Sequence, residues 1–439
     1  MSFLQPDAVL TPRGLLEGVA VELLGDRIGR VGPLPADVDA SQVERLRGKV
    51  LLPGFVNAHS HAFQRGLRGH VQHRATHGPG ADDSFWTWRE AMYGLADTLD
   101  PDTVEQVSTL AFKEMVAAGF TTVGEFHYLH HQPDGTPYDE PDELAHRVIA
   151  AAKTAGIRLV LLYVAYARAG FGVAANPRQR RFLHRSPDDV LAAVLRLQRS
   201  DGSVRIGLAP HSIRACPADW LRAFAPFASS GGVIHAHVDE QPAEVAASLA
   251  EHGHRPVHVF EDAGLLTPTF SAVHLTHPDD AEIAALSQAG GSVVACPTTE
   301  LDLGDGFLPA QRLDGRVGLC IGTDSHASID PYAELRAIEW HARALSGHRN
   351  VLQPLSDWEP RDGLAARLLS IGAAGGARAL DVDAGEIVAG KLADLVAMDV
   401  TRIEFASARL LPALVFNGSP AAVSDVWIGG RRVRSSAGL

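Results

Sequence analysis

Cysteine, basic charge and long apolar runs are scarce in this chain of 439 residues, and each scarcity narrows what the protein can be. The three cysteines, Cys216, Cys296 and Cys320, are odd in number and widely separated. This pattern indicates buried thiols in a reducing compartment, and we assign them no catalytic role. No stretch reaches the roughly 18 uncharged apolar residues of a membrane-spanning helix. Residues 1–7 lack the basic start and apolar body of a secretion signal, so we expect a cytoplasmic protein without a membrane partner.

Basic residues number 39 against 52 acidic ones, for a formal net charge of -13. Nucleic acids and anionic membrane surfaces both call for a basic patch, so this balance disfavours them as partners. The 46% hydrophobic content is enough for a large core and a smaller appendage, because one barrel domain takes about 250 residues. We therefore expect two domains.

The most informative feature of the sequence is a set of apolar runs that end in side chains able to bind a metal ion. His59 and His61 lie at the far end of the run 51–61. Residues two apart on a strand share one face, so both imidazoles can reach one ion at about 2 Å. Taken alone, a His-x-His pair also fits surface or core histidines.

Three further runs carry such side chains at their C-terminal ends: His237 in 232–240, His274 in 270–277 and Asp324 in 317–325. The surroundings of Asp324 are apolar and would not tolerate an acid without a partner. Four runs of this kind predict an open catalytic zinc site.

Eight strand candidates in all lie between Leu51 and Ser325, and they alternate with segments that carry apolar residues at helical spacing. This alternation predicts an α/β protein with a (β/α)8 TIM-type barrel, in which the C-terminal strand ends surround one active-site mouth. The strand candidates are 51–61, 119–126, 157–166, 204–212, 232–240, 270–277, 291–299 and 317–325, and clear helical segments are 103–118, 142–155 and 187–199.

Both chain ends have a different pattern. Residues 21–31 predict a hairpin around Gly25-Asp26, and residues 394–398 and 426–433 predict further strands after the barrel. Two strands alone are marginal in water, so the ends should combine. We expect a small β-sandwich-like domain from 1–50 and 380–439, with the barrel spanning 51–379.

The longest expected loop runs from Arg68 to Ser84 and contains His70, His73 and His77. No strand directs these side chains, so we interpret them as solvated loop histidines rather than ligands.

Hydrolysis is the chemistry that the predicted ligands favour. Zinc lowers the pKa of a bound water to about 7 and so provides hydroxide at neutral pH. Glu240 follows His237 by three residues, where it can face that water and move protons to a leaving group. The alternative is that Glu240 orients another residue or forms a loop salt bridge.

The positions of lysine bear on the number of metal ions, because related barrels hold two metals bridged by a carboxylated lysine on a middle strand. The chain has only four lysines, Lys49, Lys113, Lys153 and Lys391, and none falls on the third or fourth strand candidate. A single metal ion is therefore the prediction.

The chain resembles the amidohydrolase superfamily in three motifs, 53–61, 322–325 and 390–396. Four rarer strings make it similar, more narrowly, to the formimidoylglutamate deiminases of histidine degradation: 59–65, 85–90, 125–131 and 296–300, with 303–306 just after the last. That resemblance covers nearly the whole chain. It implies a homodimer that hydrolyses N-formimidoyl-L-glutamate to N-formyl-L-glutamate and ammonia.

The same resemblance implies one zinc ion, or another divalent metal in its place, held by His59, His61, His237 and Asp324. His274 then becomes a catalytic partner beside Glu240 and Asp324, and the division of proton transfers among these three stays open.

The implied small-molecule substrate has two carboxylates and a cationic head, and arginine forks suit carboxylates. By resemblance, Arg89, Tyr128, His211 and Arg214 would hold the carboxylates, with Gln64 close to the formimidoyl group. Each assignment has an alternative: Arg89 can pack a lid with Trp86 and Trp88, and Tyr128 can be a structural hydrogen-bonding group. Four other histidines, His127, His130, His131 and His277, are expected to be neutral and without a role.

Two other functions compete with this prediction. An aminohydrolase acting on a purine, pterin or triazine ring would share the metal ligands but would not need arginine anchors. A non-enzymatic scaffold is also conceivable, because folds outlive functions, although the intact ligand set argues against it.

Overall fold

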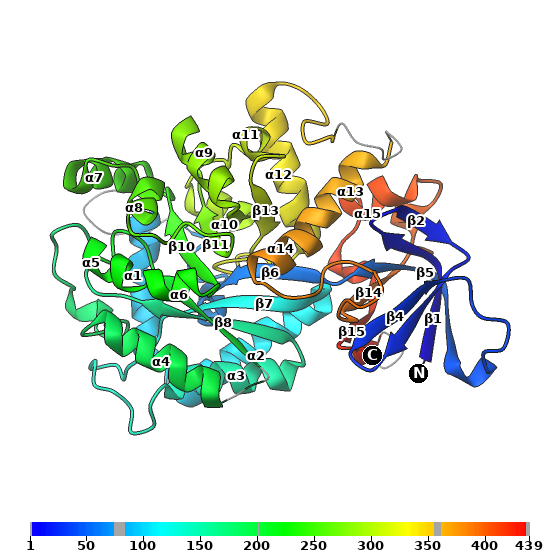
Figure 1. The fold of residues 1–439 in the computed structure, drawn as a ribbon, viewed down its shortest axis with the longest axis horizontal. Helices are drawn as coiled ribbons and strands as arrows, with labels where there is room; N and C mark the ends of the chain where they lie inside the picture. The colour runs from blue at the N-terminus through cyan, green and yellow to red at the C-terminus, as the bar shows by residue number, and fades with distance from the viewer. Residues whose placement is uncertain (1, 74–83, 201, 203, 355–360, 436–439) are drawn as a thin grey trace.

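The computed structural model describes residues 2–73, 84–200, 202, 204–354 and 361–435. It consists of a parallel barrel beside a mixed sheet, in which strands from both ends of the chain pair with one another (Figure 1). Within the part of the chain described, no helix combines the length and apolar character needed to cross a membrane.

The barrel consists of eight parallel strands, and each strand pairs with the strand that follows it along the chain. The first strand also contacts the segment after the last one, because the Asp324 amide donates to His59 O at 3.0 Å and the His61 amide donates to Asp324 O at 3.0 Å. The predicted barrel is thus confirmed. Its strands are β6 (Phe55–Ser60), β7 (Phe120–His127), β8 (Arg158–Ala165), β9 (Arg205–Pro210), β10 (Ile234–Val238), β11 (Phe270–His274), β12 (Ser292–Ala295) and β13 (Gly318–Ile321).

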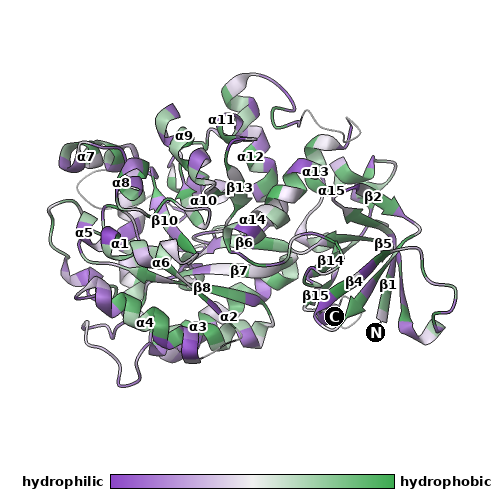
Figure 2. Cartoon of the chain, viewed as in Figure 1, coloured by the Kyte–Doolittle hydropathy of each residue, from purple (hydrophilic) through white to green (hydrophobic). Residues whose placement is uncertain are grey.

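Helices cover the outside of the barrel, and many of them carry both hydrophilic and hydrophobic residues (Figure 2). Every residue of β7, β10 and β11 is buried, as expected of parallel strands enclosed on both faces. The helices are α1 (Phe85–Thr98), α2 (Pro101–Ala118), α3 (Glu143–Ala155), α4 (Pro187–Ser200), α5 (Ala218–Ala223), α6 (Ala225–Ser229), α7 (Pro242–His252), α8 (Pro256–Asp262), α9 (Asp280–Ala289), α10 (Pro297–Leu303), α11 (Ala310–Leu313), α12 (Pro331–Ser346), α13 (Gly363–Ser370), α14 (Gly376–Ala379) and α15 (Leu410–Phe416).

The three helical segments predicted from the sequence are confirmed as α2, α3 and α4. Local signals define α2 at both ends. Asp100 accepts a hydrogen bond from the Thr103 amide, Pro101 begins the helix, and Gly119 ends it with a φ of 96°.

Three predicted strands need correction. The run 317–325 is a strand only over β13, so Asp324 lies in the turn that follows it. The run 51–61 is divided at Gly54, so that only β6 belongs to the barrel. The run 291–299 ends as a strand at Ala295, because Cys296 caps α10 and Pro297 occupies its first position.

The terminal sheet is mixed and has eight strands, which confirms a small β domain built from both ends. The predicted hairpin of residues 21–31 is present, because Val21 pairs with Val31, and the predicted C-terminal strand region forms another hairpin, in which Val426 pairs with Arg434. The domain limits at 50/51 and 379/380 stay predictions. The strands are β1 (Ser2–Thr11), β2 (Gly14–Glu17), β3 (Ala20–Leu24), β4 (Arg27–Gly32), β5 (Val43–Pro53), β14 (Leu395–Asp399), β15 (Val423–Ile428) and β16 (Arg431–Ser435).

All three cysteines are buried and unpaired, as predicted, and burial raises the pKa of Cys216 and of Cys320 to about 12. In the expected long loop, His70 and His73 are exposed, and His77 lies outside the described residues.

Candidate metal centre and catalytic cavity

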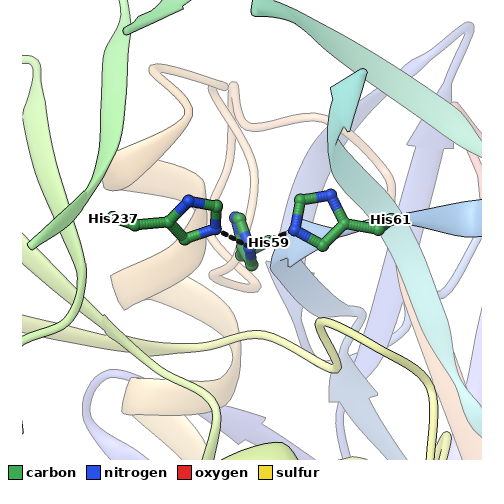
Figure 3. A group of neighbouring side chains, drawn as sticks. All are labelled: His59, His61 and His237. Atoms are coloured by element: carbon green, nitrogen blue, oxygen red, sulfur yellow. Dashed lines mark hydrogen bonds between the residues drawn. The ribbon is translucent and has the colours of Figure 1, made fainter. Parts of the chain in front are cut away.

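Three imidazole nitrogens meet at the C-terminal mouth of the barrel. His59 Nε2 lies 3.1 Å from His61 Nε2 and 3.2 Å from His237 Nε2. Figure 3 shows His59 between the other two rings, which approach it from β6 and from β10. Asp324 Oδ1 completes the group at 3.4 Å from His59 Nε2 and 3.3 Å from His61 Nε2.

These spacings fit a metal ion. Donor atoms bound tetrahedrally to zinc at about 2.0–2.1 Å lie about 3.3–3.4 Å from one another. The tautomers fit as well, because His61 Nδ1 lies 2.9 Å from Phe126 O and His237 Nδ1 lies 3.0 Å from His211 O. Each of those nitrogens must donate to its carbonyl, which leaves each Nε2 with a lone pair directed at the common point.

Burial keeps the three imidazoles neutral. It lowers the pKa of His59 to about 3, and it also lowers the pKa values of His61 and His237. Burial alone would raise the pKa of Asp324, but its hydrogen bond to His59 and the neighbouring histidines hold that pKa below the usual range. Neutral nitrogens and one carboxylate are the ligand states that a divalent metal requires.

His274 lies beside this group, with Nε2 at 3.8 Å from both Asp324 Oδ2 and Glu240 Oε1. Its Nδ1 lies 3.4 Å from Glu300 Oε1. Burial disfavours the charged ring, but the hydrogen bond to Glu300 and the charges of Glu240 and Asp324 outweigh it and raise the pKa of His274 to about 10. His274 is therefore placed to exchange protons with the two acids that face the metal centre.

Glu240 is held by a buried ion pair on its other side. Its Oε2 lies 2.5 Å from Arg214 Nη2, and Arg214 Nε lies 3.4 Å from Glu244 Oε1. Glu240 thus lines the cavity, where a role in proton transfer would place it, and it also forms a salt bridge, which was the alternative interpretation from the sequence.

Polar side chains with unused hydrogen-bonding capacity lie on the cavity wall. Gln64 Nε2 donates to Tyr128 OH at 2.5 Å, while Gln64 Oε1 is buried with no partner in the described structure. The Arg89 guanidinium lies over the Trp86 ring at 4.5 Å, and its Nε has no hydrogen-bond partner among the described residues. These groups remain available to a ligand.

Both the backbone and the ring of His211 belong to the site. Its carbonyl oxygen accepts from the His237 amide and from His237 Nδ1, both at 3.0 Å. Burial and the nearby Arg214 lower the pKa of His211 well below its usual value, so the ring facing the cavity is neutral.

The structure brings together all the residues that were predicted to act at the site. The ones that line this single cavity are His61, Gln64, Arg89, Tyr128, His211, Arg214, His237, Glu240, His274 and Asp324, with His59 buried directly beneath. Their roles remain predictions. Trp88 also lines the cavity, and the four histidines expected to have no role, His127, His130, His131 and His277, do not.

Three buried acids beside the site had no role assigned from the sequence. Glu300 contacts His274, Glu244 contacts Arg214, and Glu125 accepts hydrogen bonds from Ser60 Oγ and the Ala62 amide. Glu125 and Glu300 stand within the strings that carry the family resemblance, but which residues they contact depends on packing between distant segments.

Comparison with known proteins shows to which family the chain belongs. Residues 50–433 match the sequence pattern of the amidohydrolase family. The chain belongs to the amidohydrolase family. Over 441 aligned residues, this amidohydrolase is 37% identical to the formimidoylglutamate deiminase of Pseudomonas aeruginosa, covering 99% of this chain and 94% of that protein.

Two solved structures are also similar to this amidohydrolase. An amidohydrolase from Brucella melitensis is 34% identical with a TM-score of 0.87, covering 99% of this chain and 95% of that one. An adenosine deaminase from Xanthomonas campestris with bound zinc is 28% identical with a TM-score of 0.79, covering 99% and 92%. Together with the histidine group, the zinc in the Xanthomonas campestris structure supports a divalent metal in this hydrolase.

Proposed function

We propose that this amidohydrolase is a cytoplasmic formimidoylglutamate deiminase, which converts N-formimidoyl-L-glutamate and water to N-formyl-L-glutamate and ammonia in histidine degradation. The observation that carries the proposal is a cavity with metal donors at its floor and the guanidinium groups of Arg89 and Arg214 on its wall. The 37% identity to the Pseudomonas aeruginosa deiminase supports the same substrate.

One zinc ion would be held by His59, His61, His237 and Asp324, whose donor atoms and tautomers suit it. When bound, the ion supplies the Lewis acidity that activates a water molecule for attack. Among the described residues that line the cavity there is no lysine to bridge a second metal.

Glu240 and His274 would handle the protons. Glu240 Oε1 lies 3.8 Å from His274 Nε2, and both line the cavity beside Asp324. Asp324 would accept each of the two protons that the water loses, and protonated His274 would give a proton to Glu240 and recover one from Asp324, so that Glu240 delivers both protons to the imino nitrogen. The C–N bond then breaks, ammonia leaves, and the carbonyl of N-formyl-L-glutamate remains.

The wall residues would recognise the two ends of the substrate. Gln64 Oε1 can accept an N–H of the formimidoyl group, because it has no other partner among the described residues. Arg89 and Arg214 would bind the carboxylates, with Tyr128 and neutral His211 as further donors. The ion pairs of Arg214 with Glu240 and Glu244 suggest that this arginine also links carboxylate binding to the proton-transfer group.

An ammonia-release assay tests the proposal by comparing N-formimidoyl-L-glutamate with its aspartate homologue, guanine and adenosine. We expect a clear preference for the glutamate compound, and Arg89→Met should raise its KM with little change in kcat. A preference for guanine or adenosine would instead favour a ring deaminase, which the similarity to the Xanthomonas campestris adenosine deaminase makes the second candidate. We also propose a homodimer, which light scattering on the purified protein would test.

A further inference from the structure

A buried chain of hydrogen bonds crosses the seam where the barrel closes, directly behind the metal donors. It contains two residues of β6, one of β7 and two of the turn after β13, and all of them are at most 2% exposed. They are Asn57, Ser60, Glu125, Thr323 and His326.

One backbone amide sets the direction of this chain at the Asn57 end, and the Ser60 hydroxyl, which donates its proton to Glu125, sets it at the other end. The Thr323 N–H can only donate, so the atom 3.0 Å away must be Asn57 Oδ1, and Asn57 Nδ2 then donates to Thr323 Oγ1 at 2.7 Å. The Thr323 hydroxyl can therefore donate to His326 Nδ1 at 3.0 Å, and His326 Nε2 donates to Ser60 Oγ at 3.1 Å. Ser60 donates to Glu125 Oε2 at 2.5 Å, so the two hydroxyls and the imidazole each donate once and accept once.

Backbone hydrogen bonds also cross the seam: the amides of Thr323 and Asp324 donate to His59 O at 3.1 and 3.0 Å, and the His61 amide donates to Asp324 O at 3.0 Å. Between β6 and the segment after β13, regular pairing is limited to one bridge, Ser60 with Asp324. Asp324 and His326 also adopt the left-handed backbone region, with φ values of 43° and 61°, where a residue other than glycine is strained by about 1–3 kcal/mol. Such a turn persists only when surrounding contacts hold it.

We propose that this chain of hydrogen bonds positions the metal ligands, keeping His59 and His61, which flank Ser60, in register with Asp324, which follows Thr323, before any metal binds. The proposal rests on the metal-dependent function above and deepens it. The five residues are positioning residues: they touch neither substrate nor metal, and they act through the three ligands beside them.

The barrel offers a matched control for each end of the chain of hydrogen bonds. Thr323→Val removes the hydroxyl at nearly constant volume, and Thr122→Val makes the same change at a fully buried threonine of β7 whose hydroxyl has no partner among the described residues. Ser60→Ala is matched by Ser271→Ala on β11, where the buried hydroxyl also lacks a partner in the part of the chain that the structure describes. Thr323→Ser keeps the hydroxyl and should rescue function.

The experiment measures the zinc dissociation constant of metal-stripped protein by competition with a chromophoric chelator, and the thermal midpoint with and without zinc. We expect Thr323→Val and Ser60→Ala to weaken zinc binding on the order of 10–100-fold and to reduce the zinc-induced rise in the midpoint. The two control variants and Thr323→Ser should bind zinc as the unmodified chain does. If one test variant does not fold, the other serves alone.

Unchanged zinc affinity in Thr323→Val or Ser60→Ala, even with a lower midpoint of the metal-free form, would overturn the proposal and leave the deiminase function standing. Equal weakening of zinc binding in Thr122→Val or Ser271→Ala would also overturn the proposal, because the loss of any buried hydroxyl group would then have the same effect. If the unmodified chain binds no zinc, the proposed function fails first and this inference with it.

Discussion

Replacing Arg214 with methionine should destabilise the protein through the two acids that it neutralises. The side chains of Arg214, Glu240 and Glu244 are only 11%, 7% and 0% exposed. Removing one partner from a buried ion pair costs about 3–5 kcal/mol, because an uncompensated charge is left behind. We expect a loss of that size in the free energy of unfolding near neutral pH, measured by urea denaturation.

The loss should depend on pH. Burial raises the pKa of Glu244 from 4.5 to about 7, although the charge of Arg214 opposes this shift. An acid with a raised folded-state pKa stabilises the fold at low pH, and that contribution is lost as the pH rises through about 4.5 to 7. Without Arg214 the pKa of Glu244 should rise further, so the part of the deficit that comes from Glu244 should grow as the pH rises above about 7.

Arg89→Met is the matched control, because Arg89 stacks on Trp86 and forms no ion pair with the described residues. Its free energy of unfolding should stay within about 0.5 kcal/mol of the unmodified chain. Adding Glu244→Gln to Arg214→Met should recover part of the lost stability. An Arg214→Met protein as stable as the Arg89→Met control, or a deficit independent of pH, would refute the reasoning.

Four further predictions concern the metal, the proton-transfer groups and the thiols. Glu240→Gln should lower kcat about 10²–10⁴-fold and keep its zinc, and a fall of less than tenfold would remove Glu240 from proton transfer. Chelation should abolish ammonia release and lower the thermal midpoint, with zinc at about 100 times its Kd restoring about 2.7 kcal/mol, and full activity without metal would contradict this. Glu300→Gln should lower kcat more than it raises KM, because Glu300 Oε1 is 3.4 Å from His274 Nδ1, and a change in KM alone would argue against it. Thiol reagents should label Cys216, Cys296 and Cys320 only after unfolding, and labelling of the native protein would contradict their burial.

Much of the fold was predictable because its signals are local. The helical segments 103–118, 142–155 and 187–199 correspond to α2, α3 and α4 within two residues at each end, since capping residues and apolar spacing lie within the segments themselves. Two of the strand errors occurred where a short-range signal was ambiguous. An unbroken apolar run hid the division between β5 and β6, and β-branched threonines after Pro297 resembled a strand although they begin α10.

The sequence predicted which residues belong to the candidate site but not which of them contact one another. Histidine or aspartate at the ends of four strand-like runs predicted a common centre, because parallel barrel strands direct their C-terminal ends to one mouth. Which acid stands behind His274, and which acids share Arg214, could not be read from spacing. Glu300 and His274 are 26 residues apart and belong to different barrel units.

The sequence by itself determined the order of strands and helices and the residue types at each strand end, because backbone periodicity, caps and side-chain chemistry are properties of neighbouring residues. Only the tertiary structure decided the pairing of every buried charge and the chain of hydrogen bonds from Asn57 to Glu125. Those contacts depend on distances of a few ångströms between segments far apart in the chain. Such distances are set by how the strands and helices pack, and the local pattern does not contain them.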